Sequence, residues 1–153
     1  EDELTAVRLA LEAAQEVYEL FCGLRDRWAE HTPLFRDVGL GCGIASGTVV
    51  AGTFGASGLS EFSVIGAPVN LASRIQGIAP DGRIMLCSRT AELALLGIGL
   101  RGTESIHEFK GFKQPITVSL VTVSNVAAKM RARENAPVPQ ARPVSAVRDL
   151  TPR

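Results

Sequence analysis

Residues 61–76 read Glu61-Phe-Ser-Val-Ile-Gly-Ala-Pro-Val-Asn-Leu-Ala-Ser-Arg-Ile-Gln76 and join a predicted strand to a predicted helix. Gly66 marks a tight turn, and Pro68 suits the first helical position because its missing N–H would be unpaired there anyway. Asn70 and Arg74 lie four residues apart, which places them one turn apart on the same helix face. An amide can hold a sugar, and a planar guanidinium can grip phosphate through two parallel hydrogen bonds. The pair is therefore a candidate binding site, and the alternative is the polar strip of an ordinary amphipathic helix.

Length and composition indicate one domain that can bury a core. The chain has 153 residues, of which 46% are hydrophobic, and a formal net charge of zero. A neutral balance gives no reason to expect nucleic acid or an anionic membrane as a partner, and no apolar run is long enough to span a bilayer. The acidic start, residues 1–3, does not resemble a signal peptide. The widely spaced Cys22, Cys42 and Cys87 predict free thiols in a reducing compartment rather than a zinc site, so we expect a cytoplasmic location.

The C-terminal stretch differs in composition from the rest. From residue 125 onward there are six basic and two acidic residues, which leaves ten basic and fourteen acidic residues in 1–124. Residues 125–153 also contain four prolines and no aromatic residue. Such a composition buries too little apolar surface to offset chain entropy. We predict a domain over 1–124 and a disordered tail or linker over 125–153, with a basic docking segment as the alternative.

The remaining elements follow from hydrophobic spacing and turn signals. Apolar residues spaced by threes and fours predict a long helix over residues 3–29, which Thr32-Pro33 ends. In 38–44, apolar residues alternate with glycines, which predicts a strand whose glycine face is closely approached by a packed helix or a ligand. Residues 49–54 are predicted as its hairpin partner. Further strands are expected at 84–87, 98–100, 105–109 and 116–123, with a short helix at 90–96. The fold class is α+β, with a mixed or antiparallel sheet and helices on one face.

Three motifs carry a family resemblance. They are Gly43-Ile-Ala-Ser-Gly-Thr-Val-Val-Ala-Gly52, Phe62-Ser-Val-Ile-Gly-Ala-Pro-Val-Asn-Leu-Ala-Ser-Arg74 and Phe109-Lys-Gly-Phe-Lys-Gln-Pro115. Their order and spacing resemble the catalytic domain of class III nucleotide cyclases, the adenylate and guanylate cyclases, over residues 1–124. The resemblance implies a ferredoxin-like cyclase fold that lacks its first strands.

The resemblance also implies roles for individual residues. Asn70 matches the family's ribose-orienting Asn, and Arg74 matches the Arg that stabilises charge on the phosphates in the transition state. Ser63 falls where the family contacts the purine base, but a hydroxyl both donates and accepts and does not select adenine or guanine. Lys110 or Lys113 is similar to the family's phosphate-loop lysine, and the alternative is a solvated lysine in a turn.

The chain departs from the family pattern in two places. Ala67 stands where many relatives have Asp, so the helix lacks its expected side-chain N-cap, a loss of roughly 1 kcal/mol. The family's first strands, with two metal-binding Asp residues, are absent, and no carboxylate pair replaces them. The other aspartates fall on loops or on the wrong helix face; they are Asp2, Asp26, Asp37 and Asp81. The complete enzyme is expected to use Mg²⁺ or Mn²⁺, so no metal ligand is assigned in this chain.

Together these features predict an enzyme half rather than a whole enzyme. The chain is expected to act on a nucleoside triphosphate, forming a 3′,5′-cyclic nucleotide in intracellular signalling. It would pair with a second copy or with a cyclase-like partner, and be inactive alone. This mechanism requires Arg74 to be presented with Asn70 to a nucleotide bound between two subunits. An Arg74 that points into solvent away from any cleft, or that is held by an acidic neighbour of its own subunit, would contradict the mechanism even if the topology were right. The alternatives are a non-catalytic nucleotide-binding or dimerisation module, and a fragment whose exposed sheet edges promote association.

Overall fold

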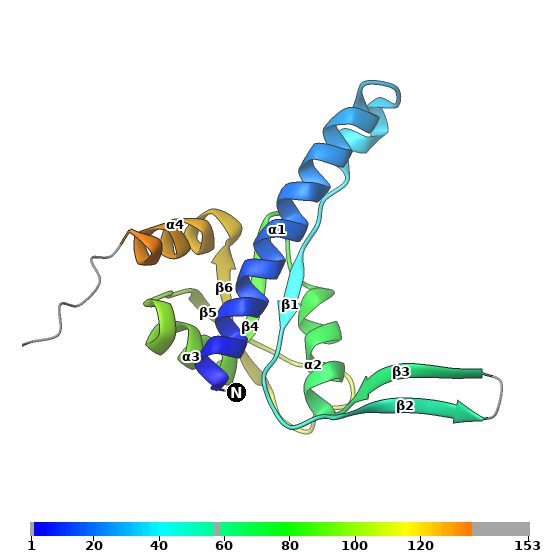
Figure 1. Ribbon diagram of the computed structural model, residues 1–153, viewed down its shortest axis with the longest axis vertical. Helices are drawn as coiled ribbons and strands as arrows, with labels where there is room; N and C mark the ends of the chain where they lie inside the picture. Colours follow the sequence, from blue (N-terminus) through cyan, green and yellow to red (C-terminus); the bar gives the residue numbers. More distant parts are fainter. Residues whose placement is uncertain (1, 57–58, 136–153) are drawn as a thin grey trace, which may run out of the picture.

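The computed structural model describes residues 2–56 and 59–135 of the chain (Figure 1). Long helix α1 and central helix α2 are close to their predicted extents. In chain order the elements are α1 (Glu3–Ala29), η1 (Pro33–Asp37), β1 (Cys42–Ile44), β2 (Val50–Ala56), β3 (Leu59–Ile65), α2 (Ala67–Gln76), β4 (Arg83–Cys87), α3 (Ser88–Ile98), β5 (Thr103–His107), β6 (Ile116–Thr122) and α4 (Val123–Glu134).

A four-stranded sheet forms the centre of the molecule. Its strand order is β1-β4-β6-β5, so β1 and β5 form the two edges. β1 runs parallel to β4, whereas β4 and β5 each run antiparallel to β6. The sheet is therefore mixed, which confirms the predicted α+β class.

Helices cover both faces of this sheet, which corrects the prediction of helices on one face. On one side, Ile84 and Leu86 of β4 join a core with α1, α3 and α4. On the other side, Met85 packs with Ile75 of α2. The cause is visible in β4 itself, because a continuous apolar run is typical of a strand buried on both faces.

The glycine-rich segment that leads into β1 and includes Gly43 of that strand is approached by α2 and the residues that follow it. A Cβ at Gly43 would lie 2.4 Å from the carbonyl oxygen of Ala72, and one at Gly41 would lie 2.1 Å from that of Ala79. The predicted close approach is therefore confirmed, and the approaching group is a helix with its C-terminal turn.

The predicted hairpin between 38–44 and 49–54 is wrong. β1 pairs with β4, while β2 pairs with β3 in a separate two-stranded sheet that runs from Val50 opposite Ile65 to Ala56 opposite Leu59. β1 is an edge strand that hydrogen-bonds to β4, and α2 packs against it. β2 therefore pairs with β3, the next strand along the chain. β2 continues to Ala56, beyond the predicted end of this strand at residue 54, and β3 begins at Leu59.

Helix α4 occupies part of the stretch predicted to be a disordered tail. The Thr122 side chain caps it by accepting a hydrogen bond from the Asn125 N–H at 3.0 Å. Val126, Ala127 and Met130 are buried, and Val126 and Met130 join the core beneath α1 and α3. The predicted domain boundary at residue 124 therefore lies inside a packed helix. Residues 136–153 lie outside the described residues.

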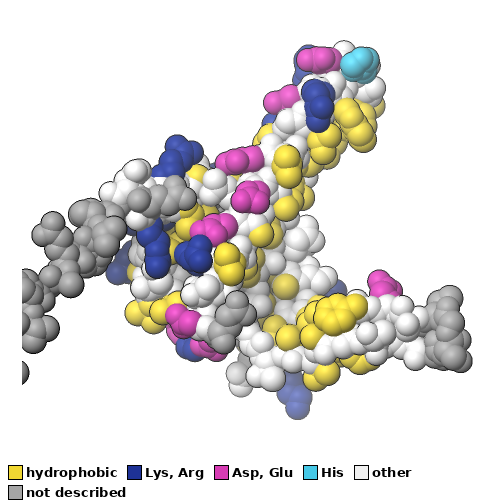
Figure 2. Space-filling model, viewed as in Figure 1, with side chains coloured by type: hydrophobic (Ala, Val, Ile, Leu, Met, Phe, Trp, Pro, Cys, Tyr) yellow, Lys and Arg dark blue, Asp and Glu magenta, His cyan; other side chains and the backbone are white. Residues whose placement is uncertain are grey.

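Two parts of the molecule project from the sheet. The C-terminal half of α1 extends beyond it with η1, and the β2–β3 hairpin extends from the start of α2 (Figure 1). Trp28 and Phe35 hold η1 against α1, with ring centroids 5.0 Å apart in an edge-to-face arrangement. Hydrophobic side chains gather on both projections (Figure 2), including the exposed Leu20 and Leu24 of α1.

Two further expectations concern the state of the cysteines and the presence of a membrane-spanning helix. Cys22, Cys42 and Cys87 are free thiols, and burial raises the pKa of Cys42 above its ordinary value. Among the described residues, none of the helices combines the length and the apolar character that crossing a bilayer requires.

Candidate functional site

Helix α2 is held to the sheet by packing rather than by a polar cap. Ile75 is fully buried between Met85 and Val118. The N-cap is Gly66, which has no side chain to bond, and Pro68 lies in the first turn. The Val69 N–H donates to the Gly66 carbonyl at 3.1 Å. The helix lacks a side-chain cap as expected, but the cap position is Gly66 and Ala67 is the first helical residue, one place earlier than predicted. The buried side of the helix fixes the direction of its exposed side.

Asn70 and Arg74 lie on this exposed side. They are separated by one turn of α2, and both are solvent-exposed. Among the described residues neither side chain has a hydrogen-bond or ion-pair partner, so no acidic neighbour of the same chain holds Arg74. Arg74 sits in the last turn, where a cation interacts favourably with the helix dipole. The hollows beside α1, α3 and α4 include neither residue. In the single chain Arg74 therefore faces solvent, which counts against the mechanism unless a second subunit covers this side of α2.

Lys110 and Lys113 lie in the turn between β5 and β6. Phe109, at the start of this turn, packs against the same cluster that anchors Ile75, and its ring stacks on His107 with centroids 6.0 Å apart. Both lysines are exposed. The turn therefore lies on the same sheet face as α2, which brings the candidate phosphate-binding lysines to the side that carries Arg74.

Ser63 is placed apart from these residues. It lies in β3 opposite Gly52 of β2 and is exposed on the projecting hairpin. No hydrogen bond within the described part of the chain joins its hydroxyl to α2 or to the turn that carries the lysines. The structure thus groups four of the five predicted site residues on one sheet face and leaves Ser63 on the arm beside it.

The aspartates have local structural roles. Asp2 caps α1 by accepting a hydrogen bond from the Leu4 N–H at 3.3 Å. Asp81 accepts one from the Leu40 N–H at 2.8 Å and lies 3.8 Å from Arg25. Within residues 2–56 and 59–135, no three or more His, Cys, Asp or Glu residues gather where they could hold a metal ion. The residues present therefore do not fit the Mg²⁺ or Mn²⁺ site that the family resemblance implies, and no chemical step is assigned to a metal in this chain.

The hairpin presents apolar side chains that the protein does not cover. Phe62 is 70% exposed, Val50 is 65% exposed and Ile65 is 55% exposed. Val50 and Ile65 face one another across the two strands. Phe62, opposite Thr53, points to the other face of the hairpin, because successive side chains of a strand alternate between faces. Both faces of the hairpin therefore expose apolar side chains.

Sequence reasoning missed a polar chain that positions the loop before the hairpin. The Ser46 hydroxyl lies 2.9 Å from Thr90 Oγ1, which lies 3.1 Å from the Cys87 sulfur. Thr90 is fully buried at the start of α3. A single threonine in a predicted helix carries no signal for such a contact, because its partners are 44 and three residues away. Elsewhere, the Gln76 amide at the end of α2 donates to the Gly41 carbonyl just before β1 at 3.4 Å.

Comparisons with known proteins give one family. A family model described as "Adenylate and Guanylate cyclase catalytic domain" matches residues 6–131. The uncharacterized protein Rv1319c of Mycobacterium tuberculosis strain H37Rv is 31% identical over 102 residues, which are 65% of this chain and 18% of that protein. The uncharacterized protein MT1361 of strain CDC 1551 is 33% identical over 95 residues, 60% of this chain and 16% of that protein. The chain therefore spans less than a fifth of the length of these relatives.

Two solved structures are similar to part of the chain. The crystal structure of the guanylyl cyclase Cya2 has a TM-score of 0.45 and 34% identity, covering 52% of this chain and 40% of that one. The adenylyl cyclase CyaB from P. aeruginosa has a TM-score of 0.47 and 32% identity, with the same two coverages.

Proposed function

Because the chain belongs to the adenylate and guanylate cyclase catalytic domain family, we propose that it takes part in converting ATP or GTP to a 3′,5′-cyclic nucleotide and pyrophosphate. The observation that carries the proposal is the pair Asn70 and Arg74, exposed and unpartnered among the described residues on a helix anchored by the buried Ile75. A polar pair on a rigid support is suited to orienting a ligand, because little ordering remains to be done on binding.

Each residue of the pair has a distinct part in this reaction. The ribose 3′-hydroxyl gives up its proton to water, its oxygen bonds to the α-phosphorus, and the bond from that phosphorus to the bridging oxygen breaks as pyrophosphate leaves. Asn70 holds the ribose so that its 3′ oxygen lies in line with the leaving group. Arg74 donates hydrogen bonds to the phosphate oxygens, whose charge grows in the transition state.

A second subunit is part of the proposal because the pair cannot supply the whole effect. A hydrogen bond to a charged group contributes roughly 1.5–3 kcal/mol, whereas enzymes typically lower barriers by about 8–23 kcal/mol. We infer that a second copy of the chain or a cyclase-like partner closes the site. The carboxylates then come from a cyclase-like partner, because the described residues of a second copy bring together no group of three or more possible metal ligands either. The exposed Phe62, Val50 and Ile65 of the hairpin support contact with such a partner.

Half-site complementation tests this proposal. The chain is mixed with a cyclase domain that keeps its carboxylates but carries Ala in place of its own equivalents of Asn70 and Arg74. We expect no product from either protein alone, and cyclic nucleotide from the mixture with Mn²⁺ and ATP or GTP. Arg74→Ala should lower the rate of the mixture about 10- to 150-fold, the loss that one charge-assisted hydrogen bond predicts. Arg36→Ala is the matched control, since Arg36 is exposed in η1 on the far part of α1.

Two further variants separate assembly from chemistry. Phe62→Ser should weaken co-sedimentation of the two proteins and reduce product in parallel, whereas Arg74→Ala should leave co-sedimentation intact. Lys110→Ala and Lys113→Ala, made singly, show which lysine contacts the phosphates by a raised KM for the triphosphate. A mixture that co-sediments but yields no cyclic nucleotide above blank would contradict the enzymatic role.

A non-catalytic nucleotide-binding or dimerisation module is the second candidate. It is favoured by one observation, namely that within residues 2–56 and 59–135 no group of three or more His, Cys, Asp or Glu residues could hold a metal ion. Calorimetric titration with a non-hydrolysable triphosphate distinguishes the two. Under the catalytic proposal, Arg74→Ala slightly weakens binding of the triphosphate and greatly lowers the rate at which the complemented mixture forms cyclic nucleotide. A module would bind nucleotide, or would form dimers without it, and produce nothing in any mixture.

A further inference from the structure

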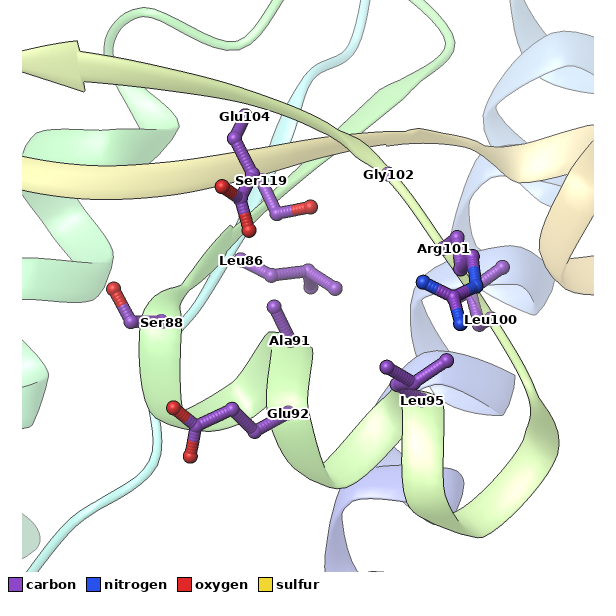
Figure 3. A pocket seen from close by; sticks show the side chains of 10 residues that line it. All are labelled: Leu86, Ser88, Ala91, Glu92, Leu95, Leu100, Arg101, Gly102, Glu104 and Ser119. Carbon is purple, nitrogen blue, oxygen red and sulfur yellow. The ribbon is translucent and has the colours of Figure 1, made fainter.

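A hollow on the face opposite α2 has no part in the proposed function. It has a volume of about 340 Å³ and lies between α3 and the strands β5 and β6 (Figure 3). Leu86, Ala91, Leu95 and Leu100 give it an apolar wall, and Glu104, Ser119 and Arg101 give it polar groups. This volume falls within the range of small-ligand sites, which are mainly apolar with a few convergent polar groups.

A row of side chains across the sheet forms one wall of the hollow. Ser119 of β6 lies opposite Leu86 of β4 on one side and opposite Glu104 of β5 on the other. Residues directly opposite one another in antiparallel strands share a face, so the Ser119 hydroxyl and the Glu104 carboxylate project to the same side. Figure 3 shows the Ser119 hydroxyl and the Glu104 carboxylate directed towards the space beside α3.

Ser119 is the observation that points to a ligand. The residue is only 4% exposed, and its hydroxyl has no hydrogen-bond partner among the described residues. No fully enclosed side-chain oxygen or nitrogen in the described part of the chain lacks a partner, so the small exposed area of Ser119 includes its oxygen, which opens into the hollow. A nearly buried hydroxyl without a protein partner is unfavourable. A polar group of a bound molecule would satisfy it.

Gly102 keeps the space beside this hydroxyl open. A Cβ at Gly102 would lie 2.3 Å from Ser119 Oγ and 2.6 Å from the Leu120 carbonyl oxygen. Any larger residue would therefore press against the serine hydroxyl and close that side of the hollow.

Opposite charges line the hollow without pairing. Among the described residues, neither Arg101 nor Glu104 has an ion-pair partner within 4.0 Å, whereas Glu92 lies 3.8 Å from Arg89. The guanidinium of Arg101 and the carboxylate of Glu104 lie on different sides of the hollow in Figure 3. Glu104 and Arg101 are thus left to attract a cationic and an anionic group respectively.

From these features we propose that the hollow binds a free α-amino acid with an aliphatic side chain. The ammonium group donates to the Glu104 carboxylate and the Ser119 hydroxyl, and the carboxylate accepts hydrogen bonds from Arg101. The aliphatic side chain packs on Leu86, Ala91 and Leu95. Three faces of the hollow thereby match the three substituents of one molecule, and the site is independent of Asn70 and Arg74.

A titration of the full ¹⁵N-labelled chain with L-leucine, followed by NMR, tests the proposal. We expect saturable shifts centred on the amides of Arg101, Gly102, Glu104 and Ser119. Glu104→Gln and Arg101→Gln should each weaken binding by about tenfold or more, because each removes a charge-assisted hydrogen bond. Ser119→Ala should weaken it less. Glu108→Gln is the control, since Glu108 is exposed four residues from Glu104 and does not line the hollow.

Two analogues test each end of the ligand separately. Leucinamide lacks the carboxylate and should lose its dependence on Arg101, and 4-methylpentanoate lacks the ammonium and should lose its dependence on Glu104. Both should bind more weakly than L-leucine. The spectra report folding directly, so a misfolded variant is recognised and replaced by Ala91→Met, which fills the hollow. No saturable shift up to the solubility limit of leucine, equal binding of 4-methylpentanoate, or binding unchanged in Glu104→Gln and Arg101→Gln would overturn the proposal.

Discussion

The two faces of the four-stranded sheet are built for different purposes. Under α1, α3 and α4, side chains such as Leu11, Leu86 and Val126 are at most 1% exposed, and they form one continuous core. On the opposite face the buried cluster is small, centred on Ile75 and Met85. Beyond it the hairpin and the exposed side of α2 meet solvent. The first face carries most of the core and, at its edge, the hollow beside α3, whereas the second presents the hairpin and the exposed side of α2 to a partner.

This difference explains why apolar side chains stabilise the single chain in one region and not in the other. An apolar side chain in the core contributes to the stability of one chain, at roughly 25 cal/mol per Å² of apolar surface buried. An apolar side chain on the hairpin contributes nothing of this kind until another surface covers it. Stability and assembly are thus carried by separate sets of residues, and substitutions can address them separately.

The largest effect is expected from a cavity in the core. Leu11→Ala should lower the free energy of unfolding by about 2–5 kcal/mol, because it removes buried methyl groups and leaves a void. Leu11 is fully buried between α1 and the sheet. Urea unfolding followed by circular dichroism, at a concentration where the chain is monomeric, measures the change.

Phe62→Ala is the matched variant on the hairpin. Phe62 is 70% exposed, so its removal should change the unfolding free energy of the monomer by no more than about 0.5 kcal/mol. Similar losses in the two variants would mean that the hairpin packs on its own chain and that the contrast between the faces is wrong.

A smaller effect is expected where α2 meets β1. Gly43→Ala places a Cβ 2.4 Å from the Ala72 carbonyl oxygen and 2.6 Å from the Gln76 backbone nitrogen. Because backbone atoms must move, we expect a loss of about 1–3 kcal/mol in unfolding free energy. Displacement of α2 should also move Arg74, so complemented cyclase activity should fall further than the loss of stability alone requires.

Gly52→Ala is the control for this position. Gly52 lies in β2, and a Cβ added there would meet no described atom within 4 Å, so alanine should be neutral or slightly stabilising. If both glycine variants were equally stable, the close approach of α2 would not be as tight as the geometry indicates.

The glycine pattern shows what the sequence could predict. Alternating glycines at 39, 41 and 43 predicted a close approach, and the structure places α2 and the residues after it there. Local signals also placed α1, α2 and β4 within a few residues. They failed for strand pairing, because β1 and β4 are distant in sequence and pair through a parallel register that no turn motif encodes.

The positions of the candidate site residues could be predicted from the sequence only in part, for the same reason. Asn70 and Arg74 lie on one helix, so their spacing was enough to place them together. Lys110 and Lys113 join their face only because Phe109 packs beneath α2, a contact between distant segments. The hollow beside α3 was missed, since Ser119, Gly102 and Arg101 come from three different positions around the β5–β6 pair. No periodicity within one segment reports such a convergence.

The smallest effect concerns the boundary of the core at α4. Composition predicted a tail from residue 125, because prolines and basic residues are frequent over 125–153 as a whole. The window was too wide, since the buried Val126, Ala127 and Met130 occupy its first part at helical spacing. If α4 belongs to the stable face, its cap should matter to the whole domain.

Thr122→Ala tests this point, because it removes the oxygen that accepts the Asn125 N–H. We expect unfolding free energy to fall by about 0.5–2 kcal/mol, with faster hydrogen exchange at the Asn125 amide. Thr53→Ala serves as the comparison, since Thr53 is exposed on β2 without a side-chain hydrogen bond among the described residues. A cap on a frayed end would alter local exchange alone, whereas a cap on a helix of the core lowers global stability as well. A change in hydrogen exchange confined to the Asn125 amide, with no loss of unfolding free energy, would therefore mean that α4 is not part of the stable face and that the domain ends near residue 124.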